Sequence, residues 1–78
     1  MKRTGEATEQ AVLVQAEPIE LCQFVKFAGL AATGGDAKQL IKAGKVLLNG
    51  TVETQKAKKL HGGDKVTVGR DCRVVQVG

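Results

Sequence analysis

The segment TGGDAKQLIKAGKVLLNG, residues 33–50, carries the clearest structural pattern in this 78-residue chain. Thr33 and Asp36 have the Thr-x-x-Asp spacing of a helix start, where a side-chain oxygen accepts a hydrogen bond from the backbone N–H three residues later. The Asn49-Gly50 pair is typical of a two-residue hairpin turn, because both residues tolerate positive φ. The segment therefore predicts a capped helix that leads directly into a β-hairpin.

Within this predicted helix, Ala37, Leu40 and Ile41 lie at positions i, i+3 and i+4, so they share one apolar face. Gly44 follows the last apolar residue and can adopt the left-handed conformation that commonly closes a helix. The pattern predicts a short amphipathic helix that packs against a core.

Lysines occupy the other side of the same helix. Lys38 and Lys42 are four residues apart and are therefore neighbours on one face, and we expect Lys45, just beyond the helix end, to continue the line. Like charges at this spacing slightly destabilise an isolated helix. We interpret the row as a binding face for an anionic partner.

An earlier apolar stripe predicts another helix before this one. Its members, at i, i+3, i+4 and i+7, are Leu21, Phe24, Val25 and Ala28. Pro18 is expected at the first helical position, where its missing N–H is not needed, and Gly29 is expected to end the helix. Phe27 lies off the stripe, so it either contacts the N-terminal strand or remains partly exposed.

Short β-runs flank the helices. Residues 11–15 predict an N-terminal strand, residues 61–64 form a turn after the core residue Leu60, and residues 65–68 and 72–77 predict two further strands. The expected fold class is α+β, with two packed helices against a small twisted, mainly antiparallel sheet.

The domain organisation follows from length and composition. Residues 1–10 are polar and lack an apolar period, so we expect a flexible tail before a single domain at residues 11–78. The apolar run at residues 12–14 is too short for a signal peptide, and no stretch approaches the length of a membrane span. These features predict a cytoplasmic protein that has no membrane partner.

The positive charge is concentrated in one region. Residues 26–59 contain seven lysines and two acidic residues, a net charge of +5, whereas the rest of the chain has five basic and six acidic residues, a net charge of −1. A basic region of this kind attracts polyanions such as nucleic acid. A lysine-rich surface that only aids solubility is the simpler alternative.

The sequence contains no recognisable motif for catalysis or for metal binding. Cys22 and Cys72 have no second ligand at a zinc-binding spacing, so we expect free thiols, no metal and no cofactor. His61 lies in a predicted turn without a nucleophile or an acid in a known motif. A chain of this length also has little interior for a substrate pocket, and we expect no enzymatic activity.

Taken together, residues 19–68 resemble the S-four-type RNA-binding domain, also called the αL RNA-binding motif. That family has a Leu-x-x-φ-φ-x-x-x-Gly-Leu helix, in which φ is apolar, a capped second helix, a Val-x-φ-Asn-Gly hairpin and a Leu-x-x-Gly-Asp turn. The matching residues here are Leu21, Phe24, Val25, Gly29, Leu30, Thr33, Ala37, Gln39, Leu40, Ile41, Val46, Leu48, Asn49, Gly50, Leu60, Gly63 and Asp64.

The resemblance implies a small stand-alone bacterial protein, associated with translation or the ribosome, that binds structured RNA such as ribosomal or transfer RNA. The expected RNA-binding residues are Lys26, Lys38, Lys42, Lys45, Lys56, Lys58 and Lys59, and further candidates for contact are Thr33, Gln39 and Asn49. One departure concerns Gly34 and Gly35, which stand where many members carry two arginines. Their presence removes two bidentate phosphate contacts.

The residues also predict the mode of binding. The chain has no Trp or Tyr, and therefore no row of aromatic platforms for splayed bases. Contacts from lysine to phosphate suit a double-stranded or compactly folded RNA, with about four to six phosphates engaged. Two alternatives remain: a β-grasp-like adaptor that binds proteins, and a DNA-binding module, since lysine–phosphate contacts do not distinguish the sugars. The sequence identifies no protein partner.

Overall fold

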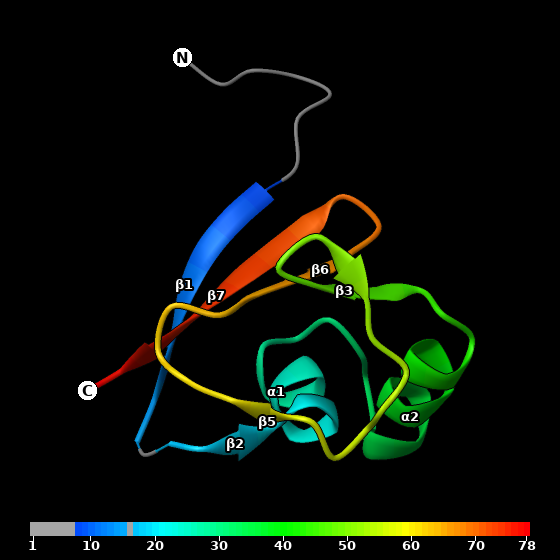
Figure 1. The fold of residues 1–78 in the computed structure, drawn as a ribbon, viewed down its shortest axis with the longest axis horizontal. Coiled ribbons are helices and arrows are strands. Elements are labelled where there is room, and N and C mark those ends of the chain that lie inside the picture. The colour runs from blue at the N-terminus through cyan, green and yellow to red at the C-terminus, as the bar shows by residue number, and fades with distance from the viewer. Residues whose placement is uncertain (1–7, 16) are drawn as a thin grey trace.

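The computed structural model describes residues 8–15 and 17–78, and this part of the chain forms two helices and seven strands (Figure 1). In chain order the elements are β1 (Thr8–Val14), β2 (Ile19–Glu20), α1 (Leu21–Phe27), α2 (Gly34–Lys42), β3 (Val46–Leu48), β4 (Thr51–Val52), β5 (Lys59–Leu60), β6 (Lys65–Val68) and β7 (Asp71–Val77). Both helices lie on the same side of the main sheet, which gives the α+β architecture that the sequence predicts.

The main sheet has five strands in the order β1-β7-β6-β3-β4. Strands β1 and β7 are parallel, and the other three pairings are antiparallel, so the predicted mainly antiparallel sheet is confirmed. A second, two-stranded sheet joins β2 to β5, with Ile19 opposite Leu60 and Glu20 opposite Lys59. This small sheet ties the start of α1 to a segment about 40 residues later in the chain.

The hydrophobic core lies between the helices and the sheet. Phe24 is its largest side chain and is fully buried, and the apolar stripes predicted for both helices point into it. The other core residues are Val14, Leu21, Val25, Ala37, Ile41, Val46, Leu60, Val66 and Val75. Burial of these side chains is the main force that holds two short helices in place, because helices of this length are marginal on their own.

The local signals of residues 33–50 are confirmed by the backbone. The Thr33 hydroxyl accepts a hydrogen bond from the backbone N–H of Asp36 at 3.0 Å, which caps α2. Gly44 follows the helix with a φ of 77°. Asn49 and Gly50 have φ values of 53° and 87°, as a two-residue hairpin turn between β3 and β4 requires.

Two boundaries differ from the sequence predictions. Strand β1 begins at Thr8 because its whole length pairs with β7, so the start of order predicted near residue 11 was too late. The remainder of the predicted tail, residues 1–7, lies outside the described residues. Pro18 is not the first helical residue: Ile19 and Glu20 pair with β5 instead, which moves the helix start to Leu21.

Cys22 and Cys72 are both free, as predicted, and Cys72 is buried.

In residues 8–15 and 17–78, neither helix has the length and apolar character needed to cross a membrane.

Candidate nucleic-acid interface

Helix α2 holds Lys38 and Lys42 on its solvent side. The helix buries Ala37 and Ile41 completely, whereas both lysines are exposed. Residues four apart on a helix are neighbours, so the two ammonium groups extend from one face. Neither lysine has a carboxylate at salt-bridge distance within the described part of the chain. Helix α2 therefore presents uncompensated positive charge.

Lys45 follows the end of α2 and is also exposed. It lines a hollow of about 460 Å³ together with residues from the α1–α2 connection and from α2. The other lining residues are Leu30, Ala31, Ala32, Asp36, Gln39, Leu40 and Ala43. Lys38 and Lys42 do not line this hollow, so Lys45 has neighbours that they do not share.

The segment between β4 and β5 attaches to the start of α1 through its backbone. The carbonyl oxygens of Lys58 and Lys56 accept hydrogen bonds from the backbone N–H groups of Leu21 and Cys22, at 2.8 and 3.0 Å. These N–H groups have no partner within the helix, because the first turn lacks preceding carbonyls. The contact fixes the loop, while both lysine side chains remain exposed.

Lys59 has a different environment from Lys56 and Lys58. Its ammonium nitrogen lies 3.1 Å from a carboxylate oxygen of Glu20, across the β2–β5 pair. Both groups are partly exposed, so this pair contributes about 0–1 kcal/mol to stability. A phosphate that binds Lys59 must compete with this carboxylate, so Lys59 gains less from the contact than an unpaired lysine does.

Lys65 provides a second example of a paired lysine, on the sheet. Its ammonium nitrogen is 3.4 Å from a carboxylate oxygen of Glu9. By contrast, six lysines on the helices and their adjoining loops have no such partner among residues 8–15 and 17–78. We call these six the helix-side lysines: Lys26, Lys38, Lys42, Lys45, Lys56 and Lys58.

The three polar contact candidates also differ from one another. The amide of Asn49 is used inside the protein: it donates to Asp64 at 3.2 Å and accepts from the backbone N–H of Lys65 at 2.9 Å. The Thr33 hydroxyl caps α2. Gln39 is exposed on α2, so it is the candidate whose side chain is best placed to meet a ligand.

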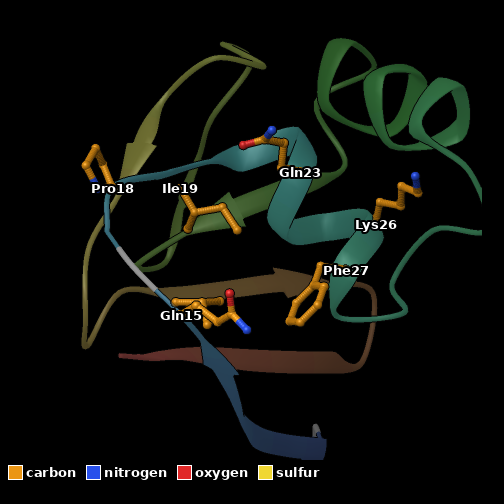
Figure 2. A pocket seen from close by; sticks show the side chains of 7 residues that line it. Gln15, Pro18, Ile19, Gln23, Lys26 and Phe27 are labelled. Carbon is orange, nitrogen blue, oxygen red and sulfur yellow. The ribbon is translucent and has the colours of Figure 1, made fainter. Parts of the chain in front are cut away.

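An aromatic residue that sequence reasoning left unassigned lies at a second hollow. Phe27 projects from α1 beside a hollow of about 570 Å³, which Lys26 also lines (Figure 2). The sequence signal for it was its position off the apolar stripe, which leaves an aromatic ring on the outside of a helix.

The described residues contain no group of three or more His, Cys, Asp or Glu side chains that could hold a metal ion. The chemistry available at this surface is therefore that of ammonium groups, amides, one exposed aromatic ring and shallow apolar hollows.

Comparisons with known proteins place this architecture in a family. A family model described as the S4 domain matches residues 12–77. The chain is 38% identical over 58 residues to "Putative RNA-binding protein YbcJ" of Escherichia coli K12, which covers 73% of this chain and 83% of that protein. It is 33% identical over 57 residues to "Probable ribosome maturation protein RlbA" of Bacillus subtilis 168, which covers 73% of this chain and 80% of that one.

A solved structure agrees in fold. The solution structure of YbcJ from Escherichia coli, described as revealing an αL motif involved in RNA binding, matches with a TM-score of 0.65 at 28% identity. The match covers 97% of this chain and 95% of that chain. The resemblance inferred for residues 19–68 is thereby confirmed, and the structural match extends beyond them to nearly the whole chain.

Proposed function

The chain belongs to the S4 domain family, and on that premise we propose that it is a non-catalytic RNA-binding protein that holds folded RNA through lysine–phosphate contacts. One observation carries the proposal. The helix-side lysines lack carboxylate partners within the described residues, so their charge is available to an external anion. Phosphate groups spaced along a nucleic acid would neutralise several of them at once.

The names of the relatives support RNA as the ligand. One is named for RNA binding and another for ribosome maturation, and the matched structure is described by an RNA-binding motif. We therefore propose a structured RNA of the translation apparatus, ribosomal or transfer RNA, as the target, with action in the cytoplasm. These names do not favour the β-grasp-like adaptor.

The proposed contact set begins with Lys38 and Lys42 on α2. The exposed pair offers a rigid spacing, because both side chains start from one helix face. Lys56 and Lys58 add a second group at the start of α1, held by the backbone contacts of their loop. Lys59 ranks lower, since Glu20 already neutralises it.

The polar candidates for RNA contact also differ in whether their side chains already have partners within the protein. Gln39 and Lys45 border the smaller hollow, where they could contact ribose or phosphate oxygens. Thr33 and Asn49 act mainly in capping and in the hairpin, because their side chains already form internal hydrogen bonds.

Fluorescence anisotropy with a labelled transfer RNA or ribosomal RNA hairpin tests the proposal. We expect binding by the native protein at about 100 mM salt and a loss of about 100-fold or more in the Lys38→Glu/Lys42→Glu variant, because two phosphate contacts become two repulsions. Lys65→Glu is the matched control on the sheet, with an expected change within about threefold.

Duplex DNA of the same length serves as competitor, and circular dichroism verifies folding of each variant. Equal binding of RNA by the native protein and the double variant would contradict the proposed surface. A preference for the DNA competitor would assign the surface to DNA instead.

A further inference from the structure

Phe27 is the one large aromatic side chain that the described structure leaves in solvent. Its side chain is 62% exposed, whereas Phe24, the other aromatic residue of the chain, is completely buried. An aromatic ring exposed to this extent leaves most of its apolar area in contact with water, and burial of that area against a ligand would be favourable. Most of the surface of Phe27 is thus available for contact with a ligand.

The hollow beside Phe27 is lined by residues from three parts of the chain. Besides α1, these are Val14 and Gln15 at the end of β1, and Pro18 and Ile19 before α1. Figure 2 shows the Phe27 ring and the amide end of Gln15 turned toward the same gap. At about 570 Å³, the hollow falls within the range of small-molecule sites, roughly 300–1,000 Å³.

One charged side chain, that of Lys26, borders the hollow, and none of the seven lining residues is acidic. Lys26 has no carboxylate partner in the part of the chain that the structure describes. In Figure 2 its amine points away from the gap, on the side where α2 lies.

A ligand that suits these groups has a flat ring, hydrogen-bonding edges and an adjacent negative charge. We propose that an unpaired nucleotide of the bound RNA enters this hollow and stacks its base on Phe27. The amide of Gln15 hydrogen-bonds the base edge, and Lys26 neutralises the adjoining phosphate. The inference rests on the proposed function and adds to it a preference for RNA that has an unpaired nucleotide next to a folded or paired region.

This site is compatible with recognition mainly by shape. A row of platforms is needed to follow a single strand, but one platform is sufficient for one extruded base. The helix-side lysines hold the paired region, and Phe27 adds a contact that a fully paired RNA cannot make.

Two RNA duplexes of equal length test the inference, one blunt and one with a three-nucleotide single-stranded overhang. We expect the native protein to bind the overhang duplex about fivefold more tightly or better at the same salt concentration, as expected from one base–aromatic stack. Phe27→Leu retains apolar bulk but removes the ring. We expect this variant to lose the preference while its affinity for the blunt duplex stays within about twofold.

Leu13→Ala is the matched control, because Leu13 is similarly exposed at 58% and does not line the hollow. It should retain the preference. If the native protein binds both duplexes equally well, or if Phe27→Leu keeps the preference, the nucleotide site is refuted while the RNA-binding function stands.

If neither duplex binds, the proposed function fails, and a separate measurement still decides the hollow. In NMR titration with adenosine 5′-monophosphate, we expect ring-current shifts of the Phe27 ring protons and of the Gln15 side-chain amide. Shifts at both residues would support the nucleotide site, and unchanged signals at millimolar nucleotide would overturn it.

Discussion

The lysines on the helical layer and the lysines that pair across strands differ in what faces them. Lys59 and Lys65 each have a carboxylate oxygen within 3.4 Å, from Glu20 and Glu9. The helix-side lysines have none in residues 8–15 and 17–78. Similar side chains at similar exposure therefore have different electrostatic roles, which a count of charges along the chain does not reveal.

This difference indicates which lysines are available for binding. A lysine already paired with a carboxylate gains less from a phosphate, because the new contact replaces an existing one. An unpaired lysine gains the whole contact and releases a counterion from the nucleic acid. We therefore expect the loss of RNA affinity on substitution of a lysine to depend on whether that lysine lacks a carboxylate partner, and not on its position in the basic segment.

After the double reversal on α2, the largest expected effect on RNA affinity is a reversal of charge at the loop pair, Lys56 and Lys58. In Lys56→Glu/Lys58→Glu we expect RNA affinity to fall by about 30-fold to 100-fold at 100 mM salt, because two unpaired contacts become repulsive. The loop should remain attached, since its contacts to α1 use backbone carbonyls. Anisotropy measures the affinity, and unchanged binding would confine the interface to α2.

Asn49 is a polar residue whose side chain already forms hydrogen bonds within the protein, so we expect it to affect stability and not RNA binding. Asn49→Ala should lower the free energy of unfolding by about 1–3 kcal/mol, because it removes two side-chain hydrogen bonds and leaves Ala at positive φ. Asn49→Gly, which tolerates this φ, should cost less. Urea unfolding measures both, and the folded variants should bind RNA like the native protein.

A more direct contrast compares neighbouring lysines. Lys58→Ala should weaken RNA binding by about threefold to fivefold and reduce the magnitude of the salt slope by about 1, as expected for loss of one phosphate contact. Lys59→Ala should change the affinity by less than twofold, because Glu20 already pairs with Lys59. Equal losses at both positions would show that pairing does not decide availability.

The smallest expected effect is a gain in RNA affinity, from the substitution Glu20→Gln. Glu20→Gln removes the charge that faces Lys59 but keeps a side-chain oxygen as an acceptor. RNA affinity should rise by about twofold, because Lys59 becomes available to phosphate. The same anisotropy titration measures the change, and weaker binding would contradict the interpretation of the pair.

Much of the fold could be predicted because it follows from local rules. The Thr33 cap, the Asn49-Gly50 turn and the apolar stripe that includes Phe24 depend on residues within a few positions of each other. The resemblance to the S-four-type domain added their order, and the family model confirmed it.

The parts that could not be predicted depend on long-range pairing. Strand β1 begins at Thr8 because it pairs with the C-terminal strand, and β2 exists because Ile19 meets Leu60. The pairing of Lys59 with Glu20 spans 39 positions, so no local pattern signals it. The sequence therefore predicts the candidate site only as a basic segment, whereas its division into paired and unpaired lysines required the structure.

The salt dependence of RNA binding tests the central claim most directly. With about four to six phosphates neutralised, log affinity should fall linearly with log salt at a slope of about −3 to −5. The Lys38→Ala/Lys42→Ala variant should have a slope smaller in magnitude by about 2. An affinity independent of salt, or an identical slope in the variant, would contradict the claim that unpaired lysines on α2 hold the RNA.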